Sequence, residues 1–174
     1  VMSFRGALLG TMLRNDTYHF SQLGNFIERA DNTARILDVK YFILLPKATD
    51  VGSDIDMQQW AQILRSVSGH RSYRWFYRDS NYRPWLVSEF LILREEMPRS
   101  LVFSYQWINL ALAGLQSLYQ KRYPCHEMAF DTYQRLKNGS MDEIFQDGLH
   151  EFLQDFINAN TRLSQSIATT YNFP

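Results

Sequence analysis

The stretch from Phe20 to Leu45 places the strongest constraint on how this chain can fold. Small or apolar residues recur through it at alternating steps of three and four: Phe20, Leu23, Ile27, Ala30, Ala34, Leu37, Tyr41 and Leu44. Only a helix places residues with this spacing on one side. With Asp16 as its N-cap and Pro46 after its end, the helix would have about thirty residues and a length of about 45 Å. Because that length spans a small domain, we expect the other elements to pack around this helix.

A second line on the same helix is mostly charged. It consists of Gly24, Glu28, Asp31, Arg35 and Asp38, which helical spacing places together. The helix is also apolar on a third side, so we expect it to be central and to enclose part of this charged line. Arg35 would be neutralised by Asp31 and Asp38, which lie within one turn of it.

Glu28 is the first candidate for a residue that faces a ligand. One turn away it finds only Gly24 and Asn32, neither of which is cationic. Its charge therefore needs water, an arginine on another helix, or a ligand. A solvated or ion-paired surface carboxylate is the commoner situation for such a residue.

The remaining patterns indicate further helices and no strand. The expected segments are 57–68, a short helix within 70–83, 84–94, a long helix beginning at Pro98 and reaching 120, 124–137, and a last helix from 140 to the region of 171. Ser140 and Glu143 have the spacing of a capping box for that last helix. No stretch alternates with a period of two between turn signals. We therefore predict one all-α domain over residues 1–174, a helical bundle of about six helices around a long central helix.

Composition removes several classes of function. The 18 basic and 18 acidic side chains cancel, so bulk charge gives no reason to bind nucleic acid or an anionic membrane. Residues 100–120 carry no charge, but the glutamine and asparagine line within them favours a helix buried in a soluble bundle over a membrane span. The single Cys125 excludes an intrachain disulfide. With no leader-like start, we expect a cytoplasmic protein.

Residues 70–83 interleave four arginines with five aromatic residues. This composition resembles a platform for single-stranded nucleic acid, on which bases stack on rings and arginines meet phosphates. The favoured interpretation is a short helix whose rings fill the core while its arginines lie at the edge. We therefore predict no nucleic-acid partner and keep an RNA-binding module as a weaker alternative.

The motifs of most metal and nucleotide sites are absent. There is no Glu-x-x-His pair for a carboxylate-bridged di-metal site, no P-loop and no nucleophile elbow. The nearest metal-like pair is Asp147 with His150, which we expect to be a solvated pair, so no metal and no cofactor is predicted. If the chain is an enzyme, Glu28, His150 and Glu151 are its catalytic candidates.

Four separated motifs resemble the bacterial alpha-E domain family. In chain order they are MLRND, LGNFIERADNTARILDVKY, MPRSL and EIFQDGLHEFL. The resemblance implies an all-helical protein that is encoded or fused with a circularly permuted ATP-grasp protein and with transglutaminase-like partners. It implies a role in peptide-bond formation or modification, and no established activity of the chain alone.

The family's signature residues fall on identifiable positions. The helix signature falls on Glu28, Arg29, Ala30, Asp31 and Arg35, the Pro-Arg-Ser motif on Pro98, Arg99 and Ser100, and the His-Glu-Phe-Leu run begins at His150 and Glu151. Asn25 departs from the basic residue that is usual there. Members also tend to carry an earlier, related helix signature, so we expect this chain to be the C-terminal part of a longer one. A half of a larger bundle would expose core-like surface, which favours a homodimer.

Two hypotheses follow. In the leading one, an accessory protein without activity of its own holds a partner, or its carboxylate- or phosphate-bearing substrate. The ligand-binding residues would be Glu28, Arg29, Asp31, Arg35, Arg99 and Ser100, with Glu28 orienting an amine or pairing with Arg99. Arg99 and Ser100 would meet the anion at a helix start. In the alternative, the chain is an enzyme with Glu28 or His150 as general base, with or without a metal.

Overall fold

The computed structural model describes residues 6, 10–43, 54–78 and 81–172, and the side chains of 41–43 are outside the description. Within these residues eight helices follow one another and no strand occurs. They are α2 (Asp16–Ile43), α3 (Asp54–Ser66), α4 (His70–Tyr77), α5 (Pro84–Ile92), α6 (Leu101–Tyr119), α7 (Pro124–Lys137), α8 (Met141–Asp147) and α9 (Leu149–Thr170). The prediction of an all-α fold is confirmed.

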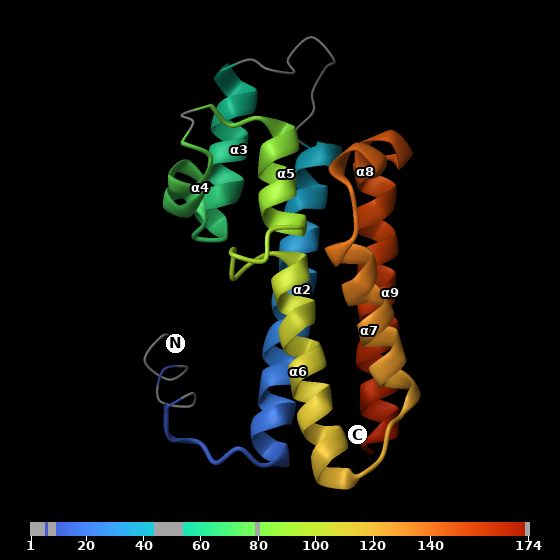
Figure 1. The fold of residues 1–174 in the computed structure, drawn as a ribbon. Coiled ribbons are helices and arrows are strands. Elements are labelled where there is room, and N and C mark those ends of the chain that lie inside the picture. Colours follow the sequence, from blue (N-terminus) through green and yellow to red (C-terminus); the bar gives the residue numbers. More distant parts are fainter. Residues whose placement is uncertain (1–5, 7–9, 44–53, 79–80, 173–174) are drawn as a thin grey trace.

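The long helices run alternately up and down a bundle (Figure 1). The longest, α2, runs along its whole length, and α5 and α6 return beside α2 almost in line with each other. Then α7 runs back up, α8 crosses near the top, and α9 descends beside α2 and α7. The pair α3 and α4 is attached at one end, on the side away from α9.

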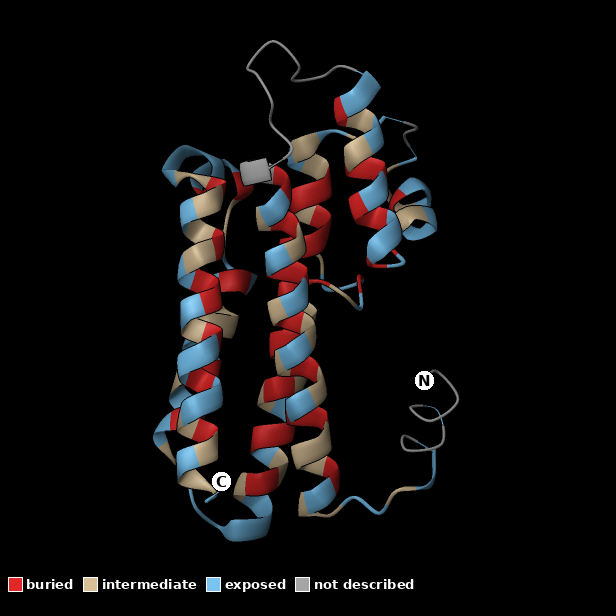
Figure 2. Cartoon of the chain, turned by 180° about the vertical axis from the view of Figure 1, so that it is seen from behind, coloured by how far each residue is buried: buried red, intermediate tan, exposed pale blue. Residues whose placement is uncertain are grey.

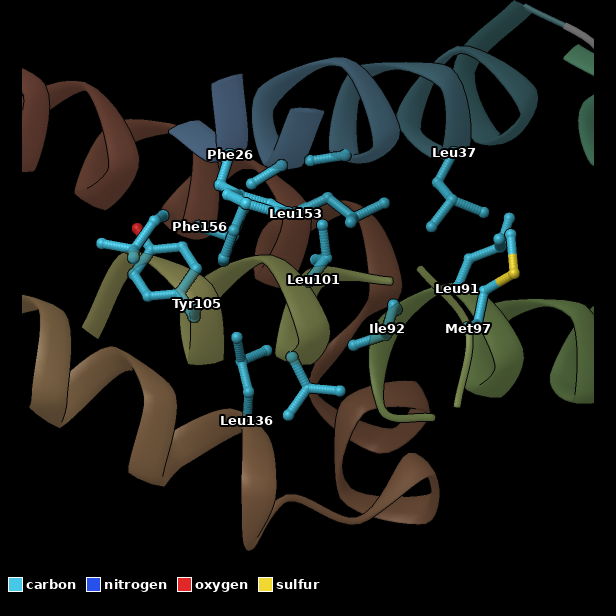
Figure 3. Packing of buried hydrophobic residues seen from close by; sticks show 14 of the residues in the cluster. Phe26, Leu37, Leu91, Ile92, Met97, Leu101, Tyr105, Leu136, Leu153 and Phe156 are labelled. Carbon is cyan, nitrogen blue, oxygen red and sulfur yellow. The ribbon is translucent and has the colours of Figure 1, made fainter. Parts of the chain in front are cut away.

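The core lies between α2, α6 and α9 and continues into residues of α5 and α7 (Figure 3). From the apolar line of α2, Leu23, Ala30, Ala34 and Leu37 are buried, as their spacing predicts. Small residues let α2 and α6 come close together. A Cβ atom at Gly114 of α6 would lie 2.1 Å from a ring carbon of His19 on α2, so the glycine makes room for that imidazole.

A buried amide joins the three long helices. Asn160 of α9 is 2% exposed and lies between α2 and α6. Its carbonyl oxygen accepts from the Tyr105 hydroxyl at 3.1 Å, and its amide donates to the Ile27 carbonyl at 3.1 Å. Because a buried polar group left without a partner is costly, these two bonds fix the position of α9 against both neighbours.

A buried ion pair joins α2 to α3. The Lys40 side chain is 2% exposed, and its Nζ donates to Asp56 Oδ1 at 2.6 Å and to Gln59 Oε1 at 2.5 Å. The same ammonium lies 5.4 Å from the centre of the Trp60 ring. Nothing in the sequence patterns predicted that this lysine would be enclosed.

Several predicted helix boundaries differ from the structure, and the helix expected at residues 57–68 is α3, Asp54–Ser66. The long helix expected to begin at Pro98 begins at Leu101, because the buried Ser100 is its N-cap and accepts from the Phe103 N–H at 3.1 Å. The single last helix expected from Ser140 is divided into α8 and α9 at Gly148, whose φ of 103° interrupts the helix. Ser140 makes no side-chain cap bond, so the capping box with Glu143 does not form.

The start of α2 is shifted by one residue from the prediction. The Asn15 side chain accepts from the Tyr18 N–H at 3.2 Å and caps the helix, whereas Asp16 bonds to the neighbouring Thr17. The uncharged α6 packs against α2 and α7, but it is buried less completely than its sequence predicted, because Leu110 and Leu118 are exposed. Among the helices that the structure describes, none combines the length and apolar character required to cross a bilayer.

Candidate functional site

One side of α2 faces solvent along its length. Its exposed residues are Gly24, Glu28, Asn32, Arg35 and Val39. Figure 2 shows that buried and exposed residues alternate along the long helices. The expected charged line is therefore divided: Glu28 and Arg35 are exposed, whereas Asp38 is partly buried against α9, because α6 and α9 cover two sides of α2 and leave a third open.

Glu28 stands on this open surface. Its carboxylate is exposed and makes no hydrogen bond or ion pair with the part of the chain that the structure describes. The proposed pairing with Arg99 is therefore not formed. A Cβ atom at Gly24, one turn before, would have no neighbour within 4 Å, so the surface beside Glu28 is unobstructed.

Arg29 turns toward the fold instead. Its Nη1 donates to the Pro98 carbonyl at 3.0 Å, and its guanidinium carbon lies 4.8 Å from the centre of the Phe26 ring. One turn further, the fully buried Thr33 donates its hydroxyl to the Arg99 carbonyl at 2.9 Å. Two successive carbonyls of the connection between α5 and α6 are thus held by α2. The helix signature and the Pro-Arg-Ser motif are far apart in the sequence but are in contact in the folded chain.

This anchorage determines what the Pro-Arg-Ser motif can offer a ligand. The Ser100 hydroxyl is buried and occupied by the Phe103 N–H, so it caps α6 and does not face an external anion. The Arg99 side chain is half-buried and makes no hydrogen bond or ion pair with the described residues. Of the two residues predicted to meet an anion, Arg99 alone retains that capacity.

Arg35 forms the ion pair that helical spacing predicted with one of its two acids. Its guanidinium binds Asp31 through contacts of 2.7 and 3.2 Å, and these bonds raise the pKa of Arg35. Asp38 points to α9 instead, where its oxygens contact His150 Nδ1 at 2.6 Å and Gln154 Nε2 at 2.7 Å. The expected trio is therefore a pair, and Asp38 serves to join two helices.

The three catalytic candidates are not brought together. His150 of α9 contacts Asp38 of α2, whereas the part of α9 beside Glu28 is near Asn160, which bonds to Ile27. Because Asp38 lies ten positions after Glu28 on α2, His150 and Glu28 are separated by about 15 Å along the helix axis. The carboxylate of Glu151 lies over Gly148, where an added Cβ would be 2.1 Å from its Oε2. Within the described residues, no group of three or more metal-ligating side chains could hold a metal ion.

Glu151 and Asp147 border an open pocket between α7, α8 and α9. The pocket has a volume of about 660 Å³. Its charged lining residues are Arg135, Glu143, Asp147, Glu151 and Asp155. His150 is not among the lining residues, so the Asp147 and His150 pair considered from the sequence does not form a common site.

A family model described as a predicted alpha-helical domain with a conserved ER motif matches residues 1–172. The chain belongs to the Alpha-E family. Glu28-Arg29 is the one Glu-Arg pair in the sequence, so the ER motif falls on it. In this Alpha-E protein the two residues of the motif have different environments, since Arg29 holds a backbone carbonyl and Glu28 faces solvent. No curated protein and no solved structure matched the chain.

Sequence reasoning missed the contacts that join distant parts of this Alpha-E chain. Asp38 and His150 are 112 residues apart, and Arg29 and Pro98 are 69 apart. Lys40 and Asp56 are only 16 apart, but no helical spacing relates them because they lie on different helices. The one signal in the sequence was that the helix signature and the Pro-Arg-Ser motif both occur in one family. Their joint occurrence does not specify which atoms contact each other.

Proposed function

We propose that the chain is an accessory helical protein of an ATP-grasp-linked peptide ligation or modification system, and that Glu28 binds a cationic or amine group of the partner or its substrate. The observation that supports this is the exposure of Glu28. The family description calls the ER motif conserved, and yet this carboxylate has no partner in the described chain. A conserved, exposed charge is usually retained for binding or catalysis.

The Pro-Arg-Ser motif, which is anchored on α2, carries the second charge of this proposal. Arg29 and Thr33 hold the carbonyls of Pro98 and Arg99. Glu28 is next to Arg29 on α2, and Arg99 belongs to the segment that Arg29 and Thr33 hold. The anion-binding guanidinium and the cation-binding carboxylate are therefore carried by two segments that are hydrogen-bonded to each other. Such a pair suits a partner or substrate that bears an amine together with a carboxylate or phosphate.

Co-purification tests this proposal. The chain is co-expressed with a circularly permuted ATP-grasp protein, the partner that this proposal names, and the amount of that protein recovered with the tagged chain is measured. Glu28→Ala and Arg99→Ala should each lower the affinity by about tenfold or more, which corresponds to the loss of one charged contact. The matched controls Asp131→Ala on α7 and Arg162→Ala on α9 remove exposed charges elsewhere and should have no effect.

Both test residues are exposed or half-buried and lack partners in the described chain, so the variants should keep the helical circular dichroism and melting temperature of the parent. An undiminished complex with both Glu28→Ala and Arg99→Ala would show that this surface does not hold the partner.

One observation favours the enzyme alternative. Asp38 Oδ1 lies 2.6 Å from His150 Nδ1, and a carboxylate at that nitrogen fixes the orientation of an imidazole. If His150 is a general base, purified protein should cleave or form peptide bonds, His150→Gln should abolish the activity and Asp38→Asn should reduce it. Absence of turnover with a range of peptides and amino acids would leave the accessory role.

A further inference from the structure

The region around α4 is strongly basic, although the whole chain is neutral. Residues 65–83 contain five arginines and one acid, Asp79, for a formal charge of +4. Arg65, Arg71, Arg74 and Arg78 are exposed, and none of them makes a side-chain hydrogen bond or an ion pair with the residues that the structure describes. We call these four arginines together with Trp75 the α4 patch.

Three of these arginines lie close enough together to act on one side chain. His70, at the start of α4, is half-buried, and its Nε2 lies 2.6 Å from the Tyr82 hydroxyl. Burial lowers the pKa of His70, and Arg65, Arg74 and Arg71 lower it further through their charges. The positive charge of the patch is therefore concentrated at this end of the molecule.

An exposed tryptophan lies within this positive surface. Trp75 is 81% exposed, although tryptophan is usually well covered. It borders an open pocket of about 370 Å³. The other lining residues are Arg71, Ser72, Phe76, Phe90 and Glu96, so the pocket combines an apolar floor with a charged rim.

We propose that the α4 patch docks an acidic, amphipathic segment of a partner protein. An apolar side chain of that segment would enter the pocket beside Trp75, and its carboxylates would meet the arginines. Exposed tryptophan and arginine are the residue types that most often dominate binding energy at protein interfaces. Charge complementarity selects an acidic segment, and the concave apolar pocket selects one that presents a bulky aliphatic or aromatic residue.

The aromatic residues of this region disfavour RNA as the occupant. A platform for single strands needs several ring faces open to successive bases. Tyr73 is buried, and its ring packs against Tyr77 at 4.9 Å and Phe90 at 5.7 Å. Phe76 and Tyr77 are partly buried, and the centres of their rings are 4.9 Å apart. Trp75 is thus the one ring of α4 that is fully presented, which suits an anchor better than a stack.

The α4 patch is a different surface from that of Glu28, but the two adjoin the same connection. Glu96 lines the pocket and Met97 lies against Gly69 at the start of α4, whereas Pro98 and Arg99 are held by α2. Figure 1 shows α4 at the outer edge of the molecule, beside α3. A partner could contact both surfaces, but binding at the α4 patch does not require Glu28.

Fluorescence anisotropy with a defined probe tests the inference. The probe is a labelled peptide of about twelve residues with leucine and phenylalanine on one helical face and glutamate on the other. In about 0.15 M salt, the double variant Arg71→Glu/Arg74→Glu and the variant Trp75→Ala should each bind it about tenfold more weakly or worse. The matched control Arg162→Glu, which reverses an exposed charge on α9, should bind as the parent does.

Three results would overturn the inference: no binding of the acidic peptide, equal weakening by Arg162→Glu, or tighter binding of poly-uridine RNA or of phosphatidylserine vesicles with the same dependence on Arg71 and Arg74. The last result would assign the patch to nucleic acid or to lipid. Glu28→Ala should leave peptide binding unchanged, so that failure here and failure of the role proposed for Glu28 can be told apart.

Discussion

Glu28 and Arg29 are adjacent in sequence and opposite in role. A helix turns by about 100° per residue, so neighbours on it face different surroundings. Arg29 reaches the Pro98 carbonyl and the Phe26 ring, whereas Glu28 meets solvent. If Glu28 binds a partner as proposed, the conserved pair combines one residue that stabilises the fold with one that binds outside it. Stability measurements should separate the two.

Arg29→Ala should destabilise the fold by about 2 to 3 kcal/mol, because it removes a charged hydrogen bond to Pro98 and the contact with Phe26. Thr33→Val, which keeps the shape of the side chain, should cost about 1 kcal/mol through the lost bond to the Arg99 carbonyl. Urea unfolding measures both. Glu28→Ala should stay within about 0.5 kcal/mol of the parent. A loss for Glu28→Ala as large as that for Arg29→Ala would show that Glu28 is structural.

Sequence spacing predicted side-chain pairs on one helix better than pairs between helices. The contact between Arg35 and Asp31 follows from their separation of four positions along the helix, and it forms. Asp38 satisfies a similar spacing rule, but it bonds to His150 and Gln154 because α9 brings two donors to it. The spacing of a single helix contains no information about what another helix presents.

At the scale of elements, the contact between α2 and α6 depends on a glycine. In the parent, a Cβ at Gly114 would overlap the ring of His19, so Gly114→Ala should destabilise the fold by about 1 to 3 kcal/mol. In a His19→Ala background the ring is absent, and the same substitution should stabilise the fold by about 1 kcal/mol through helix propensity. A double-mutant cycle followed by thermal or urea unfolding measures the coupling. Additive effects would mean that His19 moves aside without cost.

The ion pair between α2 and α3 should show the asymmetry expected of buried charges. Lys40→Ala leaves Asp56 buried without its cation and should cost about 3 to 5 kcal/mol. Replacing both residues, as Lys40→Met with Asp56→Leu, should cost far less or nothing. Denaturant unfolding of Lys40→Ala and of the double variant checks this. If the double variant were as unstable as Lys40→Ala, the pair would be needed for packing rather than for charge balance.

The elements themselves were largely predictable, and their ends were less so. The apolar spacing of α2 and the charge-free run of α6 each indicated a helix that the structure contains. The ends depended on single residues with special geometry. Gly148 adopts a positive φ that divides α8 from α9, and Pro98 is fixed by Arg29 in a turn before α6. Neither conformation follows from periodicity.

At the scale of the whole molecule, the formal charge of zero conceals an uneven distribution. The α4 patch is basic, and the pocket between α7, α8 and α9 is lined by four acids and one arginine. Composition therefore argued correctly against a uniformly charged surface and could not locate either region.

The homodimer expected from the sequence stays a prediction. Measurement of the molar mass of the protein in solution tests for this dimer. The exposed apolar residues to substitute in that test are Leu110, Leu118 and Phe130 on α6 and α7.

The stability of the whole chain should fall as the pH is lowered from about 7.5 to about 5.5. Burial lowers the pKa of His19, helped by the charge of Arg14 and opposed by Asp16. Burial and three arginines lower the pKa of His70. The ordinary histidine pKa is about 6.5. Below it the unfolded chain binds protons that the folded chain resists, so acidification favours unfolding, whereas above it both states are neutral and the effect disappears.

Urea midpoints measured across this pH range test the sign. His70→Gln can still bond to Tyr82 but cannot be protonated, so it should flatten the decline, and the double variant with His19→Gln should flatten it further. Resonances of the His70 ring should titrate at a lower pH in the folded protein than in urea. A midpoint that rose on acidification, or a decline that His70→Gln left unchanged, would mean that His70 is better solvated than its burial and its surrounding arginines indicate.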